Sequence, residues 1–319
     1  MSDTDLVLRH SKHLLGSGLD DRGLRRAAER GELVRVASGT FIPAGVWSQL
    51  TDAERSALRT VTALRRIDPL LIASHLSAAA IWGLPDRDGW PDAVHVIDTR
   101  RSTGNSTPAL VRHALPVEPD EVATHSGIRL TNATRTAVDV ALIEPFATAL
   151  MTFDHGLRHD LFTRESAHLQ LDRRPAARRR RSARRALELA SPLAGSPAES
   201  LSRAVMIEGG VPAPVLQQPF RDARGKIGDV DFWWPEFGVI GEMDGNQKYL
   251  DPGMLGGRTP AQAVIDEKRR EDRLRAVRGV RTVVRWGYRD VEESSRLVFL
   301  LAQAGVVASS PRRRPRTSS

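Results

Sequence analysis

The chain has 319 residues, 40% of them hydrophobic and 27% charged, so it carries enough apolar residues to fold and is not a wholly disordered chain. It contains no cysteine, which excludes disulfide scaffolds, thiolate zinc sites and cysteine nucleophiles and is typical of a cytoplasmic protein. No apolar run approaches the ~18 residues of a membrane helix, and residues 1–10 lack the apolar core of a signal peptide, so we expect neither membrane insertion nor secretion.

The net charge of +8 lies in two arginine blocks. Eight arginines fall within residues 173–185 and four within residues 312–316, so the remaining residues carry a net charge of −4. Such blocks commonly contact phosphate backbones, with an affinity that depends strongly on salt. They are equally compatible with a solvated linker and a frayed tail, and the sequence leaves both interpretations open.

Patterning along the chain predicts an α/β multidomain protein with five segments. These are an N-terminal winged helix-turn-helix at 1–45, a small α/β middle domain at 51–171, an arginine-rich linker at 172–195, a mixed-sheet domain at 196–307 and a disordered basic tail at 308–319.

The first segment predicts two helices and a hairpin. Residues 6–15 are expected to form a short helix, and Asp20 or Asp21 caps a second one. Two strands follow, at residues 33–36 and 40–42. The second helix has a basic face made of Arg22, Arg25, Arg26 and Arg30. This order indicates a winged helix-turn-helix whose arginine-faced helix enters a DNA major groove; the alternative is a helical hairpin that contacts only protein.

The middle segment mixes helices with short strands. Helices are expected at 52–66, 73–82, 134–142 and 145–159, and strands at 93–97, 109–113 and 127–130. The nine histidines show no metal-binding spacing, and we expect His75 to be a buried, hydrogen-bonding side chain. Arg135 and Asp139 are spaced for an ion pair on one helix face. Nothing in this segment requires catalysis.

The fourth segment carries a cluster of acids. A strand with Asp231 is followed, after a turn, by a strand with Glu242 and Asp244, and Glu199 lies on the preceding helix. Converging carboxylates repel one another unless a cation intervenes, and hard oxygen ligands without histidine favour Mg²⁺ or Mn²⁺. Such a cation could activate water against a phosphodiester, with Lys248 orienting that water or neutralising charge. The alternative is that each acid is solvated or pairs with an arginine of the helix 260–277, and Asp229 competes with Asp231 for the same face.

The fourth segment resembles the PD-(D/E)XK endonuclease superfamily, and within it the very-short-patch-repair-like nuclease domain. The resemblance spans about residues 196–305 and is carried by residues 230–236, 239–245, 266–272 and 279–286. It implies a helix, three strands, a helix and a final strand around a restriction-endonuclease-like mixed sheet. It also implies that Glu199, Asp231 and Glu242 bind the metal ion and that the substrate is DNA.

One position departs from the superfamily pattern. The superfamily's lysine would stand two residues after Glu242, where this chain has Asp244. Related domains carry a later basic or amide residue, here Gln247 or Lys248, and Gln218 on the preceding strand is another substitute. A degenerate domain that binds DNA without cutting it is therefore the alternative.

Residues 1–170 resemble the AbiEi-like antitoxins, in which a winged helix precedes a small α/β domain. Residues 30–36, 74–85 and 131–136 carry this resemblance, which implies transcriptional regulation and a toxin or regulatory protein as partner. The sequence thus predicts a Mg²⁺-dependent DNA endonuclease with an N-terminal DNA-binding module. The linker would hold the duplex by its backbone through Arg178, Arg179, Arg180 and Arg181. A non-catalytic antitoxin-like regulator and a scaffold for acidic protein partners are the alternatives.

Overall fold

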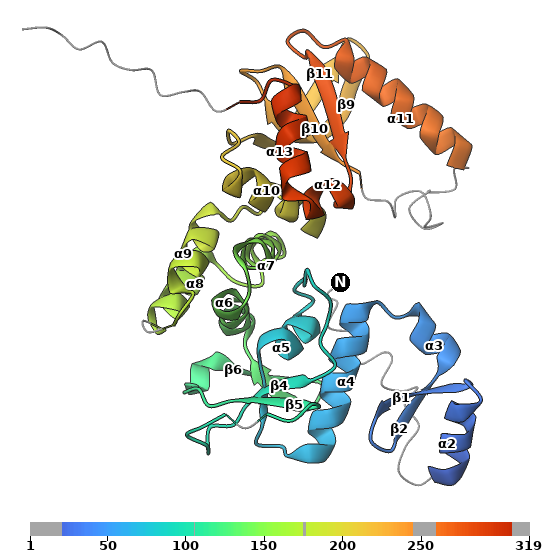
Figure 1. Cartoon of the computed structure of the whole chain (residues 1–319), viewed down its shortest axis with the longest axis vertical. Helices are drawn as coiled ribbons and strands as arrows, with labels where there is room; N and C mark the ends of the chain where they lie inside the picture. Colours follow the sequence, from blue (N-terminus) through green and yellow to red (C-terminus); the bar gives the residue numbers. More distant parts are fainter. Residues whose placement is uncertain (1–20, 105, 175–176, 245–259, 308–319) are drawn as a thin grey trace, which may run out of the picture. The chain divides into compact units, whose positions relative to one another are not determined.

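The chain is an α/β protein that divides into two compact units (Figure 1). The computed structural model describes residues 21–104, 106–174, 177–244 and 260–307. The N-terminal unit is Met1–Ser191 and the C-terminal unit is Pro192–Ser319. The predicted α/β multidomain class is therefore confirmed. No helix within the described residues is long and apolar enough to cross a membrane.

The described part of the N-terminal unit starts with a helix, a hairpin and two further helices. These are α2 (Asp21–Glu29), β1 (Leu33–Ala37), β2 (Thr40–Pro43), α3 (Ala44–Gln49) and α4 (Asp52–Ile67). Val36 and Ile42 of the hairpin belong to the same buried cluster as Leu58 and Val61 of α4. The hairpin of the predicted segment 1–45 therefore shares a core with the segment 51–171, because its apolar face packs there. The predicted helix 6–15 lies outside the described residues.

A five-stranded sheet forms the centre of this unit. Its strands lie in the order β5 (Leu110–His113), β4 (Val94–Ile97), β3 (Ile72–Ala73), β7 (Ile128–Thr131) and β6 (Val122–His125), with the 3₁₀ turn η1 (Pro119–Glu121) before β6. Helix α4 begins at a capping box, in which Thr51 and Glu54 satisfy each other's backbone N–H. Helix α5 (His75–Trp82) ends at Gly83, whose φ of +70° suits glycine. The predicted helix 52–66 is confirmed, and the predicted helix 73–82 is confirmed from His75 on, whereas Ala73 belongs to β3.

Four helices follow the sheet, namely α6 (Ala133–Ile143), α7 (Phe146–Arg158), α8 (Arg164–Asp172) and α9 (Arg180–Leu189). The last of them corrects the predicted linker 172–195, because much of that stretch is helical. Ala183, Ala186 and Leu187 of α9 are fully buried. The Arg164 guanidinium donates to carbonyls at the end of α9, including that of Ala190 at 2.6 Å. The arginine run is therefore the polar face of a helix whose apolar face belongs to the N-terminal unit.

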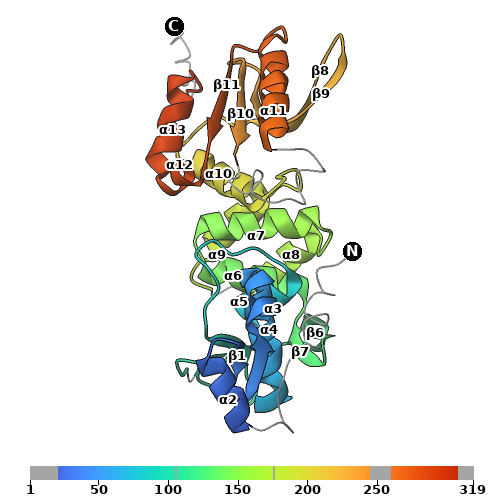
Figure 2. The same cartoon turned by 90° about the vertical axis from the view of Figure 1, so that its right-hand side faces the viewer.

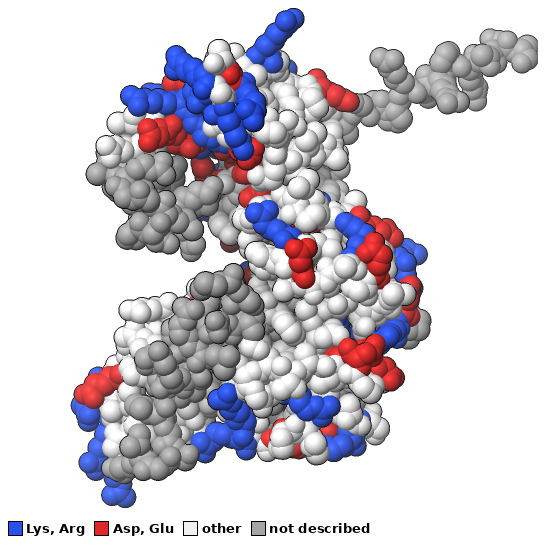
Figure 3. Space-filling view, turned by 180° about the vertical axis from the view of Figure 1, so that it is seen from behind, with Lys and Arg blue, Asp and Glu red and all other residues white. Residues whose placement is uncertain are grey.

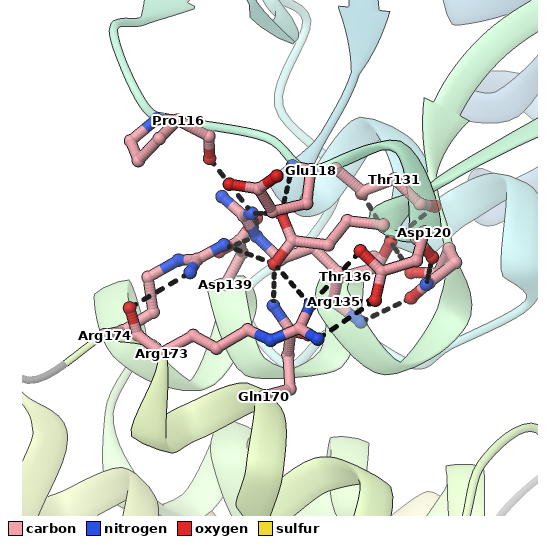
Figure 4. A network of polar contacts seen from close by, with 12 residues as sticks. Pro116, Glu118, Asp120, Thr131, Arg135, Thr136, Asp139, Gln170, Arg173 and Arg174 are labelled. Carbon is pink, nitrogen blue, oxygen red and sulfur yellow. Dashed lines mark hydrogen bonds and ion pairs between the residues drawn. The ribbon is translucent and has the colours of Figure 1, made fainter.

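A buried polar network joins α6 to the turn before β6 and to α8 (Figure 4). Arg135 is fully buried; its Nε donates to Asp139 at 2.8 Å, which confirms the predicted pair, and its Nη1 donates to Glu121. Gln170 and Arg174 donate to the other Glu121 oxygen at 2.6 and 2.8 Å. Buried charges require such partners, so we interpret this cluster as a structural one.

The C-terminal unit contains one four-stranded sheet, with the strand order β11 (Thr282–Trp286), β10 (Val239–Met243), β9 (Gly225–Trp234) and β8 (Val215–Asp222). Strand β9 is antiparallel to both β8 and β10, whereas β11 runs parallel to β10. Helix α11 (Pro260–Arg275) covers one face, and α10 (Pro197–Glu208), α12 (Tyr288–Glu292) and α13 (Ser294–Gln303) cover the other (Figures 1 and 2).

Aromatic side chains hold the α10 side of this sheet together. The indole N–H of Trp286 donates to the Ser202 hydroxyl of α10 at 2.9 Å, and the Phe232 and Trp286 rings lie 5.3 Å apart. Gly241 separates Trp286 from Trp234, and a Cβ there would meet their rings at 2.5 and 2.9 Å. A glycine is therefore required in β10 beside Glu242, because any side chain would push the strand away from its neighbours.

Candidate metal-binding acid cluster

The start of α10 positions Glu199. Ser196 caps the helix by accepting the Glu199 N–H at 3.2 Å. The Glu199 carboxylate accepts the Gly195 N–H at 2.6 Å and the Ser196 hydroxyl at 2.9 Å. A Cβ on Gly195 would stand 2.9 Å from this carboxylate, so the glycine leaves room for it. Glu199 is only 9% exposed, and these local hydrogen bonds from the turn before α10 fix its carboxylate.

Gln217 of β8 joins Glu199 to Asp231. Its side-chain N–H group donates to Glu199 Oε2 at 2.9 Å and to Asp231 Oδ1 at 3.4 Å. The Asp231 Oδ2 accepts the Met243 backbone N–H at 2.9 Å. Gln217 has a φ of +49°, a strained backbone conformation that costs about 1–3 kcal/mol and often marks functional positions. One helix and three neighbouring strands thus meet at these two carboxylates.

Gln217 contacts the acids, although the sequence interpretation did not single it out. The predicted residue, Gln218, does not take this role. The Gln218 amide donates instead to the Pro219 carbonyl at 3.2 Å. The strand register contains the missing signal, because Gln217 lies between the pairs Leu216–Phe232 and Gln218–Val230 and therefore faces the level of Asp231.

Glu242 lies next to the C-terminal residue of β10 and is 8% exposed. Both of its carboxylate oxygens accept hydrogen bonds from Arg270 of α11, each at 2.9 Å. Burial raises the pKa of Glu242, while Arg270 acts to lower it and the charge of Asp231 acts to raise it. At Glu242 the positive charge that converging carboxylates require is supplied by the guanidinium of Arg270. The alternative anticipated for the arginines of helix 260–277 therefore holds at Glu242.

The other predicted residues of the cluster lie at its edge. Asp244 follows the end of β10, and its carboxylate is 3.3 Å from the Arg285 guanidinium of β11. Asp229, the competitor of Asp231, pairs with Lys226 at 2.8 Å and is exposed. Lys248 and Gln247 lie outside the described residues. Within the described residues, Arg270 and Arg285 pair with Glu242 and Asp244; the sequence interpretation anticipated an arginine of helix 260–277 but gave neither residue a role at the site.

The donor set suits a hard divalent cation. Glu199, Asp231 and Glu242 offer only carboxylate oxygens, the ligands that Mg²⁺ and Mn²⁺ prefer. Among the residues that the structure describes, no three such side chains are already arranged around a common cation position. Arg270 supplies a local reason, since it holds both oxygens of Glu242. A divalent cation that bound both Glu242 oxygens in the position of Arg270 would displace that guanidinium.

The predicted DNA-binding arginines differ in their surroundings. On α2, Arg22, Arg25 and Arg26 are exposed, whereas Arg30 follows the helix and donates to Glu32 at 2.7 Å. Near α9, Arg178 and Arg181 are exposed, Arg179 is half-buried and Arg180 donates to Asp172 at 2.7 Å. The structure thus leaves Arg178 and Arg181 at the surface and gives Arg180 a structural contact.

Three histidines gather in the N-terminal unit. His75 is buried, with its Nδ1 2.9 Å from the Ser74 hydroxyl, which confirms the prediction for it. Its ring stacks on His113 at 3.7 Å, and His113 Nε2 lies 3.2 Å from His95 Nδ1. Burial lowers the pKa of all three, most strongly at His75, and to about 4 at His113. We therefore expect them to be neutral at pH 7.

Two proteins of Mycobacterium tuberculosis are similar to the chain. They are uncharacterized protein MT2308 and uncharacterized protein Rv2248, each 29% identical over 211 residues, which cover 61% of this chain and 74% of the relative. No protein-family model matches the chain, and no solved structure matches it. The names of these relatives state no activity, so function has to be inferred from the geometry of the site.

Proposed function

We propose that the protein is a Mg²⁺- or Mn²⁺-dependent DNA endonuclease whose active site is the acid cluster of the C-terminal unit. The observation that carries the proposal is that one amide links two carboxylates beside the strand that carries the third. Gln217 bonds to both Glu199 and Asp231, and Asp231 bonds to the backbone of Met243, which directly follows Glu242. The order of elements, a helix, three strands, a helix and a strand, supports the same proposal because it is the one that the PD-(D/E)XK resemblance implies.

The three acids would bind the divalent cation, and neighbouring groups would orient them. Asp231, Glu242 and Glu199 are the proposed ligands; the bound cation would polarise the phosphodiester and lower the pKa of the attacking water. The Met243 N–H and Gln217 orient Asp231, and Gln217 orients Glu199 in addition. Asp244 stands where the superfamily has lysine, so Lys248 remains the proposed basic residue that orients water.

Binding of the duplex is assigned in this proposal to exposed arginines. Helix α2 presents Arg22, Arg25 and Arg26 beside the β1–β2 hairpin, an arrangement compatible with a winged helix. Arg178 and Arg181 would add contacts to the phosphate backbone.

Incubation of the purified protein with supercoiled plasmid and Mg²⁺ or Mn²⁺ tests the activity. We expect nicked or linear product, no product in EDTA, and loss of cleavage to background in Glu242→Gln and Asp231→Asn. Asp229→Asn is the matched control, because it removes one charge from β9 at an exposed position outside the cluster. Cleavage that persists in Glu242→Gln would refute the assignment of the site.

One observation favours a second candidate, a non-catalytic DNA-binding regulator of the AbiEi-like kind with a degenerate nuclease domain. Arg270 neutralises Glu242 completely in bidentate geometry, and Asp244 replaces the motif lysine. This candidate predicts binding to its own promoter that EDTA does not weaken, no cleavage with either cation, and a toxin or other regulatory protein as partner. Gel-shift assays with and without EDTA separate the two functions.

A further inference from the structure

A groove of about 690 Å³ runs between the β8–β9 turn and α11. Four arginines line it, namely Arg224, Arg269, Arg270 and Arg273, together with the three acids Asp222, Asp266 and Asp272. Asp222 accepts two hydrogen bonds from Arg273, each at 2.8 Å. Arg224 is exposed, and Arg269 is 76% exposed with the nearest Asp266 oxygen at 4.0 Å. Figure 3 shows Lys and Arg side chains gathered on this unit, at the top of the view. The groove therefore offers guanidinium groups to an anionic ligand.

Arg270 stands where this groove meets the acid cluster. Besides its two bonds to Glu242, it donates to the Asp229 carbonyl at 2.9 Å and to Glu267 at 3.2 Å. Gly228 makes room for it, because a Cβ there would lie 3.1 Å from Arg270 Nε, and its φ of +152° also favours glycine. One guanidinium is thus held by the proposed cation ligand while it lines a groove suited to anions.

Arg270 cannot pair with both Glu242 oxygens and bind an anion in the groove through the same N–H groups. While Arg270 binds both oxygens of Glu242, neither its charge nor its paired N–H groups are free for a phosphate. A cation on Glu242 would replace that charge and free the two N–H groups that Arg270 now donates to Glu242, while its bonds to Glu267 and the Asp229 carbonyl would keep it at the groove. Guanidinium groups bind phosphate in the same bidentate geometry that they use for carboxylate, so the groove would then gain a phosphate ligand.

We propose that Arg270 couples the two sites, so that a divalent cation at Glu242 releases Arg270 to bind a backbone phosphate of DNA in the groove between the β8–β9 turn and α11. The identity of the ligand rests on the proposed function, whereas the coupling rests on the contacts of Arg270. Thermodynamic linkage makes the effect reciprocal, so DNA must also raise the affinity for the cation.

The test compares DNA binding by the full chain in EDTA and in Ca²⁺, with a short fluorescein-labelled duplex and anisotropy as the readout. Calcium is the test cation because it binds carboxylate oxygens. A gel of the same samples shows whether the duplex stays uncut during the binding measurement. We expect Ca²⁺ to tighten binding by the wild type about fivefold or more. In Arg270→Gln this gain should disappear. In Glu242→Gln, which removes the bidentate carboxylate partner of Arg270, binding in EDTA should already be as tight as that of the wild type in Ca²⁺.

Two variants control for charge alone. Arg296→Gln removes a positive charge from α13, outside the groove, where Arg296 pairs with Asp290 at 3.0 Å. Asp229→Asn removes a negative charge from β9 and leaves the pairing of Arg270 with Glu242 intact. The first should keep the Ca²⁺ gain, and the second should tighten binding in EDTA less than Glu242→Gln does. Melting temperatures establish that each variant is folded.

The proposal is overturned if Ca²⁺ leaves the wild-type affinity unchanged, if Arg270→Gln keeps the full gain, or if Glu242→Gln and Asp229→Asn bind equally in EDTA. These outcomes are separate from those of the plasmid assay. Coupling without cleavage would support the role of Arg270 and remove the endonuclease, whereas cleavage without coupling would keep the endonuclease and remove this role of Arg270.

Discussion

Gln217 organises the acid cluster, because its side-chain amide bonds to both Glu199 and Asp231. Gln217 bonds to one oxygen of Glu199 and one oxygen of Asp231, so it fixes the orientation of the two carboxylates relative to each other. Arg270 differs, because it takes both oxygens of Glu242 at once. Donors of the Gln217 kind, which bond to the ligands rather than to the cation, stabilise ligand geometry, whereas a bidentate guanidinium competes with a cation.

We therefore expect Gln217→Leu to lower both Mn²⁺ affinity and cleavage, by about 10- to 100-fold, because the orientation of two ligands is lost. Titration of free Mn²⁺ by electron paramagnetic resonance measures the affinity directly. Gln218→Leu is the matched control on the adjacent residue, since the Gln218 amide donates to the Pro219 carbonyl, and it should behave as the wild type. Equal effects of the two substitutions would show that Gln217 has no special role.

At the level of elements, local patterns in the sequence predict the C-terminal sheet well. Alternating side chains and turn residues predict the strands around residues 227–234 and 239–244, and the structure has β9 and β10 there. Side-chain partners were less predictable, because a carboxylate on a strand signals a need for positive charge without showing which group supplies it. Arg270 is 28 residues away from Glu242, and only the packing of α11 brings them together.

For the arginine-rich stretch 172–195, the sequence interpretation predicted a linker and missed the helix α9. Its charge suggests a linker, but Ala183, Ala186 and Leu187 have helical spacing and form the buried face of α9. Burial of that face decides the structure of the segment, whereas composition describes only its exposed side. The arginines therefore divide into two groups: Arg180 and Arg184 both bind Asp172, whereas Arg178 and Arg181 are exposed to solvent.

This division predicts different contributions to DNA binding. The double variant Arg178→Gln/Arg181→Gln should lower the slope of log affinity against log salt concentration by about 2, since each phosphate contact contributes about 1. Arg180→Gln/Arg184→Gln removes the same charge from groups already paired with Asp172, so its slope should change less. Affinities measured at several salt concentrations give both slopes. Identical slopes for the two double variants would contradict a specific contact at Arg178 and Arg181.

At the scale of the whole molecule, the two units have separate sheets and different ionisable clusters. The N-terminal unit contains the three histidines, whose pKa values burial lowers. The C-terminal unit contains the acid cluster that we propose as the cation site. Acid and divalent cations should therefore act on different units, which makes the division of the chain measurable.

Calorimetry of the full chain should show two unfolding transitions that respond to different conditions. The unfolded histidines titrate near pH 6.5, and His113 in the folded unit near pH 4, so between these values the unfolded state binds more protons. The contribution of His113 to the stability of the N-terminal unit is therefore fully present above about pH 6.5 and is lost as the pH drops toward 4. Burial raises the pKa of Asp139 in the same unit to about 6, and this carboxyl contributes in the opposite direction. A divalent cation at 100 times its dissociation constant should instead stabilise the C-terminal unit, by about 2.7 kcal/mol.

His113→Gln identifies the first transition by making its pH dependence shallower, and Glu242→Gln identifies the second by changing its response to the cation. A single transition, or two that shift together with pH, would contradict independent units, because a jointly stabilised core would transmit each perturbation to the whole chain.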